Sequence, residues 1–159
     1  MAPSRSTDFN NSAPTGLRGF WHGLAGQLTR LVPHDALALI NRVAIGAIFF
    51  LSGRTKVDGW LTVTDGTYAL FRDEYQLPLI RIEIAAHAVV GAEHLFPLLL
   101  VLGLFTRLSA LALLGMTLVI QLFVYPHVWP THLSWAGLLL YLAGRGARTL
   151  SLDRLFRIR

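Results

Sequence analysis

The stretch RLSALALLGMTLVIQLFVYPHVWPTHLSWAGLLLYLAGR, residues 107–145, decides the fold of this chain. Between Leu108 and Gly144 it contains no Asp, Glu, Lys or Arg. This uncharged run is almost twice the roughly 20 residues that a helix needs to cross a bilayer. A helix on the surface of a soluble protein keeps a polar face toward water, and this run offers none. The stretch therefore predicts two membrane-spanning helices, over 107–125 and 131–145, joined by a turn that contains two prolines.

Two further apolar segments precede this stretch, DALALINRVAIGAIFFLSG at 35–53 and LIRIEIAAHAVVGAEHLFPLLLVLGL at 79–104. Backbone amides cannot remain unpaired in hydrocarbon, so each span must be a helix or part of a closed barrel. None of the spans shows the alternation of a barrel strand. Helices that are joined by short turns pack as antiparallel neighbours. The sequence predicts an all-α membrane protein, an antiparallel four-helix transmembrane bundle over 34–146.

The segments outside the spans are more polar. Residues 1–16 lack an apolar core, so we expect a disordered tail and no cleavable signal peptide. Residues 17–33 are amphipathic and predict either an interfacial helix or a loosely helical lead-in. Part of the loop at 54–78, from Thr67 to Tyr75, is expected to form a short surface helix. Residues 147–159 form a basic tail that we expect in the cytoplasm.

Composition and charge distribution exclude several classes of protein. Only 14% of the residues are charged and 53% are hydrophobic, whereas soluble domains average about 25% charged. The chain has no cysteine, which excludes cysteine nucleophiles, disulfides and thiolate metal sites. The net charge of +5 does not indicate a nucleic-acid partner, because the basic residues gather near the two ends of the chain, where they set topology.

The basic residues also predict the orientation. With both termini inside, nine bases lie on the inner side against four on the outer side, which favours cytoplasmic termini in a bacterial cytoplasmic (inner) membrane. The nine are Arg5, Arg18, Arg30, Arg107, Arg145, Arg148, Arg154, Arg157 and Arg159.

Three ionisable residues in the second span, Glu83, His87 and His94, fall on one helical face. Ionisable groups inside a span are costly and usually face the interior of the bundle. One interpretation is a proton path or a set of ligands for a metal, a haem or a quinone. The other is structural, with neutral histidines bonded to a neighbouring helix and Glu83 paired with Arg81 or Lys56 near the headgroups.

Arg42 and Asn41 in the first span and Glu93 in the second form a second candidate site. The heights of Arg42 and Glu93 in their helices allow the arginine to bridge to the carboxylate. Such a pair either fixes the register of the two helices or forms the wall of a buried polar site. An unpaired Glu93 would be protonated, because burial disfavours the charged form.

His127 and His132 flank the turn between the last two spans and form a candidate metal site at the outer surface. Useful metal sites need three or four ligands, so an aromatic and imidazole belt at the membrane interface is the alternative. We find no phosphate loop, zinc signature or hydrolase elbow. No catalytic residues are therefore predicted, and we do not expect the chain to be an enzyme on its own.

Four stretches in order resemble the DoxX family of small four-helix membrane proteins, and together they cover about residues 40–156. They read RVAIGAIFFLSGRTKVDGW, LFRDEYQLPLI, AEHLFPLLLVLGLFTRLSAL and WAGLLLYLAGRGARTLSLDRL. The residues that match the family pattern are Arg42, Ser52, Gly53, Lys56, Glu93, Pro97, Gly103, Thr106, Arg107, Ser151 and Asp153.

The resemblance implies a role but no mechanism. The family's name traces to a subunit of a quinone-linked respiratory oxidase, and other members look like partners of oxidoreductases in redox homeostasis. The loop LFRDEY and the turn FVYPHVWPTHLSW resemble a subgroup found beside biosynthesis genes for metal-binding modified peptides, which implies metal or redox stress.

The resemblance thus favours a non-catalytic subunit or partner of a membrane redox system. Quinone and haem are the cofactors to consider. Its partners would be the lipid bilayer, an oxidoreductase or another membrane subunit, and further copies of the chain in an oligomer. The alternative is a small membrane transporter or scaffold with no redox role.

Overall fold

The computed structural model describes residues 16–31, 33–76, 78 and 80–157. The chain divides into one unit at Met1–Pro33 and a second, larger unit at His34–Arg159. The tail predicted at 1–16 lies outside the described residues except for Gly16. In the first unit, the described residues form helix α1, Leu17–Leu31.

Helix α1 leaves its large apolar side chains uncovered. Leu17, Phe20, Trp21 and Leu31 are each more than half exposed, and the rings of Phe20 and Trp21 meet edge to face. A basic residue, Arg30, lies in the last turn, where a positive charge favours the helix dipole. The surface-lying position predicted for this segment stays a prediction.

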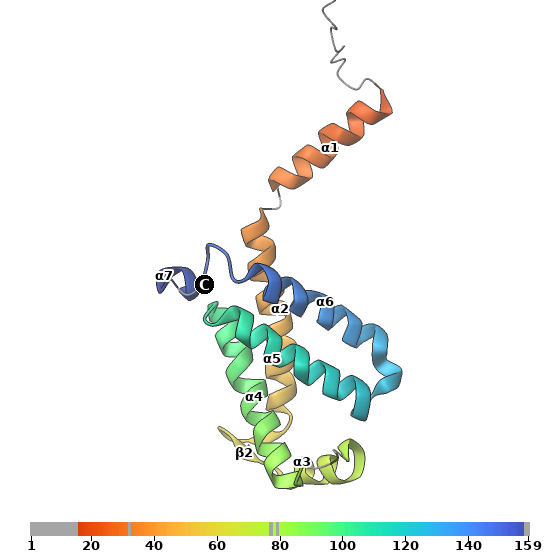
Figure 1. Ribbon diagram of the computed structural model, residues 1–159, viewed down its shortest axis with the longest axis vertical. Helices are drawn as coiled ribbons and strands as arrows, with labels where there is room; N and C mark the ends of the chain where they lie inside the picture. Colours follow the sequence, from red (N-terminus) through yellow and green to blue (C-terminus); the bar gives the residue numbers. More distant parts are fainter. Residues whose placement is uncertain (1–15, 32, 77, 79, 158–159) are drawn as a thin grey trace, which may run out of the picture. The chain divides into compact units, whose positions relative to one another are not determined.

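The second unit is almost entirely helical (Figure 1). Its elements, in chain order, are α2 His34–Arg54, β1 Val57–Asp58, β2 Thr62–Val63, α3 Asp65–Leu70, η1 Phe71–Tyr75, α4 Ile82–Leu102, α5 Thr106–Val119, η2 Ile120–Val124, η3 Pro126–Val128, α6 Trp129–Arg145 and α7 Leu152–Leu155. The segments η1 and η2 are π-helical turns that continue α3 and α5.

Helices α2 and α4 are antiparallel and very close. A Cβ atom on Gly46 would lie 2.9 Å from Val101 Cγ2, and one on Gly53 would lie 3.0 Å from Glu93 Cβ. Gly46, the earlier residue in α2, faces the later residue Val101 in α4, and Gly53 faces the earlier residue Glu93. The two helices therefore run in opposite directions. The absence of a side chain at both glycines allows the two backbones to approach.

Helix α5 packs against α4 and α6, and α6 also reaches α2. These contacts enclose one apolar core, in which Phe49 meets Trp135 edge to face at 5.5 Å. The buried members of this core are Ile45, Phe49, Leu100, Ala110, Leu113, Leu139 and Leu142. We call the end with His34, Leu102, Thr106 and Arg145 the Arg42 end, and the end with Arg54, Ile82, Val124 and Trp129 the Lys56 end.

Three helical stretches in the described part of the chain are long and apolar enough to cross a membrane: His34–Arg54, Ile82–Leu102 and Thr106–Val124. They coincide closely with the first three predicted spans. Helix α6 has 17 residues and does not reach that length. A transmembrane bundle of four helices therefore stays a prediction. Many large apolar side chains point outward, among them Ile40, Leu98 and Leu122, as helices facing lipid require.

The loop between α2 and α4 contains the predicted short helix and an element that was not predicted. Helix α3 and the turn η1 cover the expected position, and Thr64 caps α3 by accepting a hydrogen bond from the Thr67 amide. Before them, β1 and β2 form a short antiparallel hairpin that pairs Val57 with Val63. Two-residue strands carry too little alternation to be recognised in a sequence.

The close approach of α2 and α4 predicts the effect of adding volume at Gly46. Replacing Gly46 with Leu should lower the free energy of unfolding by about 2 kcal/mol or more, because the new side chain collides with Val101 and the Pro97 carbonyl. The measurement is denaturation of the purified chain in mixed micelles. Gly137→Leu is the matched control, since nothing lies within 4 Å of a Cβ there. Equal losses in both variants would contradict this packing.

Candidate functional site

A buried ion pair between Lys56 and Glu93 forms the centre of the candidate site. Lys56 Nζ lies 2.8 Å from Glu93 Oε2 and 3.1 Å from Oε1. The exposed fractions of the two side chains are 5% and 3%. Ser52 Oγ donates to Glu93 Oε1 at 3.1 Å and accepts from Lys56 Nζ at 2.9 Å. The carboxylate is therefore shared between an ammonium group and a hydroxyl, as a buried charge requires.

The local sequence brings these groups together. Ser52 lies in the last turn of α2, and Lys56 follows four residues later, where its ammonium group also reaches the Ser52 carbonyl. The Lys56 carbonyl accepts hydrogen bonds from the Thr67 hydroxyl and from the Thr64 amide. The same lysine thus fixes the end of α2 to α4 through its side chain and fixes α3 through its backbone.

His94, the next residue after Glu93, is also buried against α2. A Cβ on Gly53 would lie 2.9 Å from His94 Cε1, and the Phe50 ring meets the imidazole edge to face at 5.3 Å. His94 Nδ1 lies 2.7 Å from the Val90 carbonyl oxygen. A carbonyl cannot donate, so Nδ1 carries a proton, and in the uncharged form of the imidazole Nε2 is the acceptor. Nε2 is buried and has no partner among the described residues.

A cavity of about 460 Å³ lies beside His94. Its walls are mainly apolar and aromatic, and Trp60, at the tip of the hairpin, is 92% exposed. Arg54 holds the hairpin loop by donating to the carbonyls of Gly59 and Trp60. The lining residues are Phe50, Arg54, Gly59, Trp60, Leu61, His94 and Leu98. A concave, mainly apolar site beside a histidine suits a flat organic ligand.

The other two residues of the predicted stripe do not join this site. Glu83 and His87 are exposed in the first turns of α4. Glu83 lies 3.6 Å from Arg81, and His87 Nδ1 contacts the Glu83 carbonyl at 2.8 Å. The helical face is shared, but α2 ends at the level of His94. In the preceding turns of α4, α3 and η1 cover Ala85 and Ala86 instead, and His87 meets only the edge of this cover, with its ring 6.1 Å from that of Tyr68. The structure therefore places only His94 of the three in the interior.

Arg42 and Glu93 do not form the pair that their heights suggested. Glu93 is neutralised by Lys56 at the Lys56 end, whereas Arg42 lies at the opposite end and donates through Nη2 to the Leu150 carbonyl at 2.5 Å. Arg42 is 1% exposed, and its Nε and Nη1 have no hydrogen-bond partner in the described part of the chain. Asn41 is half-buried, and its side chain makes no hydrogen bond to any described residue.

The two histidines of the turn between α5 and α6 lie in different surroundings. His132 is buried, and its Nδ1 lies 2.6 Å from Gln121 Oε1. His127 is exposed, and its ring meets Tyr125 edge to face at 6.2 Å. Within the described ranges no three His, Cys, Asp or Glu side chains gather as metal ligands. The pair thus has no third ligand there.

Two tyrosines link the loop to the turn before α6. Tyr125 donates a hydrogen bond to Glu74 Oε2 at 2.8 Å, which raises the pKa of Tyr125. Burial raises the pKa of Tyr75 to about 12, with smaller contributions from Tyr125 and Glu93. Both phenols therefore stay neutral at physiological pH and contribute as hydrogen-bonding and packing groups.

The chain belongs to the DoxX family, whose sequence profile matches residues 37–126. It is also similar to an uncharacterized protein of Haemophilus influenzae, with 33% identity over 132 residues that cover 75% of this chain and 82% of that protein. No solved structure matches the chain.

The structure brings most residues of the family pattern together in two clusters. Ser52, Gly53, Lys56 and Glu93 meet at the Lys56 end. At the Arg42 end, a Cβ on Gly103 would collide with Arg42 Nη1 and with Ser151, and Asp153 accepts from the Thr106 amide.

The partner of Glu93 was not predicted from the sequence. Lys56 was assigned to the family pattern and to the headgroup region, because it follows the apolar run of the first span. One signal was available: a serine and a lysine four residues apart at a helix end place both groups on one face. Nothing in the sequence indicated that the lysine would turn back toward Glu93 rather than extend to the surface.

The buried pair predicts strongly non-additive mutations. Lys56→Met and Glu93→Met should each lower the free energy of unfolding by about 3 kcal/mol, because each leaves an uncompensated buried charge. The double variant should lose much less than the sum. Denaturation in mixed micelles measures all three. The exposed Arg81–Glu83 pair is the control, and its double-mutant cycle should couple by less than about 1 kcal/mol. Additive losses at Lys56 and Glu93 would contradict the pair.

Proposed function

We propose that this chain is a non-catalytic subunit of a membrane redox system that holds the headgroup of a quinol beside His94. The observation that carries the proposal is the buried, unpartnered Nε2 of His94 next to a cavity with aromatic walls. A buried acceptor without a donor is costly, so a ligand that supplies an O–H group is favoured there. A hydroquinone has a flat ring and two such groups.

The neighbouring groups suit this ligand. Phe50 and Trp60 offer aromatic surfaces to a ring, and Leu61 and Leu98 offer apolar surface to a tail. The Lys56–Glu93 pair next to His94 is internally neutralised, so it adds no net charge beside the apolar cavity. Oxidation of the quinol to the quinone would pass two electrons to an oxidoreductase partner that contains its own redox cofactor and would release two protons to water. This chain would bind and orient the ring.

The proposed function also requires a location and an orientation in the membrane. We expect all four helices α2, α4, α5 and α6 to lie in the bacterial cytoplasmic membrane with both termini in the cytoplasm. The support is the excess of arginines near the Arg42 end, which the distribution of positive charge in membrane proteins assigns to the cytoplasmic side. The site at His94 then lies toward the outer leaflet.

Binding of a short-tailed benzoquinol to the purified chain tests the site. His94→Leu should weaken binding about tenfold, because one hydrogen bond to a buried acceptor is lost. Anaerobic titration calorimetry in mild detergent gives the affinities. His87→Leu is the matched control, since His87 is an exposed histidine on the same helix, and its affinity should equal that of the wild type.

Three results of the titration would overturn the quinol site: no heat of binding, equal weakening in the His87 and His94 variants, or weakening by His132→Leu alone. The last would locate the ligand between α5 and α6, where His132 lines a different cavity. A haem absorbance band in the purified protein would identify a different occupant of His94 and would equally reject the quinol.

The buried Lys56–Glu93 pair favours a second function, a small proton-coupled transporter. An ion pair inside a membrane protein often marks a proton or substrate path. In vesicles that contain the chain and a pH-sensitive dye, this function predicts a proton leak that Glu93→Gln abolishes and the exposed control Glu83→Gln leaves unchanged. Equal dye traces for vesicles with and without the chain would exclude it.

A further inference from the structure

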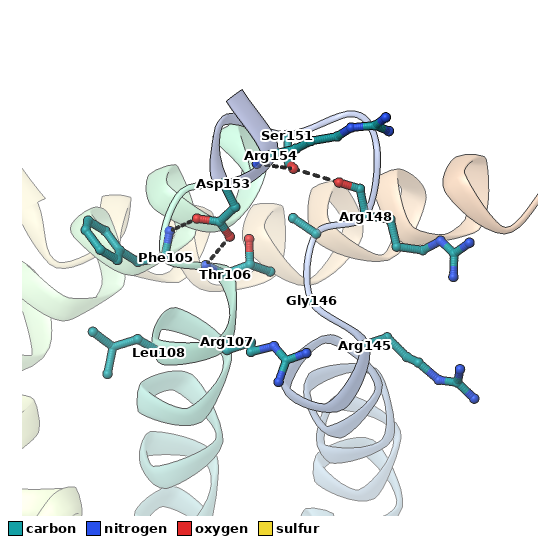
Figure 2. Close-up of a pocket in the computed structure, with 11 residues that line it drawn as sticks. Phe105, Thr106, Arg107, Leu108, Arg145, Gly146, Arg148, Ser151, Asp153 and Arg154 are labelled. Atoms are coloured by element: carbon teal, nitrogen blue, oxygen red, sulfur yellow. Dashed lines mark hydrogen bonds between the residues drawn. The ribbon is translucent and has the colours of Figure 1, made fainter. Parts of the chain in front are cut away.

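A second cavity, of about 430 Å³, lies at the Arg42 end and is used by neither function above. Its walls come from the first turn of α5, the end of α6 and the segment that follows α6 (Figure 2). The lining residues are Phe105, Thr106, Arg107, Leu108, Arg145, Gly146, Ala147, Arg148, Ser151, Asp153 and Arg154.

The walls of this cavity carry an excess of positive charge. Arg148 donates to Asp35 Oδ1 at 2.8 Å, which raises the pKa of Arg148 and occupies its charge. Arg107, Arg145 and Arg154 have no acidic partner among the described residues. Three arginines that have no carboxylate partner in the described part of the chain thus line one cavity.

The one carboxylate in the walls is already occupied. Asp153 Oδ1 accepts from the Phe105 amide at 2.7 Å, and Oδ2 accepts from the Thr106 amide at 3.0 Å. Figure 2 shows this carboxylate turned toward those amides, while Arg145 and Arg148 extend away from it. Asp153 therefore accepts hydrogen bonds from the free amides at the start of α5. The positive charge of the cavity remains available to another anion.

Large, exposed apolar side chains occur in the walls of the cavity and in the neighbouring helix α7. Phe105 and Leu108 line the cavity and are 47% and 62% exposed, and in and just after α7 Leu155 and Phe156 are 71% and 62% exposed. We call these four side chains the apolar rim. A soluble anion would leave the apolar rim exposed to water, whereas a phospholipid offers a phosphate to the arginines and acyl chains to the rim. The position at the ends of spanning helices places the cavity at the depth of the headgroups.

We infer that this cavity binds the phosphate group of an anionic phospholipid, with Arg107, Arg145 and Arg154 around the phosphate and the apolar rim against the acyl chains. Guanidinium groups suit this role because each donates two parallel hydrogen bonds to a phosphate. The bound lipid would neutralise the arginines and hold the segment after α6 against the start of α5.

Native mass spectrometry of the full chain in mild detergent tests this site. The wild type should retain phosphatidylglycerol in preference to phosphatidylcholine of the same chain length. R107Q/R145Q should reduce that preference roughly 25-fold, at about fivefold for each arginine. R72Q/R81Q removes the same charge from exposed positions outside this cavity and should leave the preference unchanged. R107K/R145K keeps the charge and should keep most of the preference, which separates charge from misfolding.

Three outcomes would overturn the lipid site. They are equal retention of the two lipids by the wild type, equal losses in R107Q/R145Q and R72Q/R81Q, and displacement of phosphatidylglycerol by millimolar inorganic phosphate. The last would identify a soluble phosphate as the ligand. All three are independent of quinol binding at His94, so either site can fail without the other.

Discussion

The Lys56–Glu93 pair lies in the protein interior, where water does not solvate an ionised side chain. Both groups are almost completely buried, so each depends on the other for its charge and on Ser52 for a further hydrogen bond. Because Lys56 follows α2 directly and Glu93 lies within α4, forming the pair brings the two helices into register. The same lysine accepts hydrogen bonds from α3 and its cap through its carbonyl. The loop and the site beside His94 therefore depend on one interaction.

The Arg42 end is organised in a comparable way by a different segment. The chain after α6 returns so that Asp153 caps α5, the Leu150 carbonyl accepts from Arg42, and Arg148 and Thr149 both donate to Asp35. Gly103 makes this approach possible, because its φ of 68° and its missing side chain leave room for Arg42 and Ser151. Polar contacts thus close both ends of an apolar core.

The helices could be predicted from the sequence because hydrocarbon leaves the backbone few alternatives. The first three spans and the short loop helix were located within a few residues. The candidate site was less accessible. Glu83, His87 and His94 share a helical face, yet their surroundings differ because α2 ends beside His94. Pairing Arg42 with Glu93 failed for a related reason, since helix heights ignore the loop that returns Lys56 to the carboxylate. Such contacts depend on tertiary structure rather than on periodicity.

The family pattern and the proposed ligand contacts fall on different residues. Ser52, Gly53, Lys56 and Glu93 bind one another and leave little capacity for a ligand. The free acceptor of His94 and the exposed ring of Trp60 lie beside them and outside the pattern. An ion pair of this kind is compatible with several ligands, because the residues beside the pair can be substituted without breaking it. Family membership therefore defines the scaffold, and the ligand must be argued from the residues next to it.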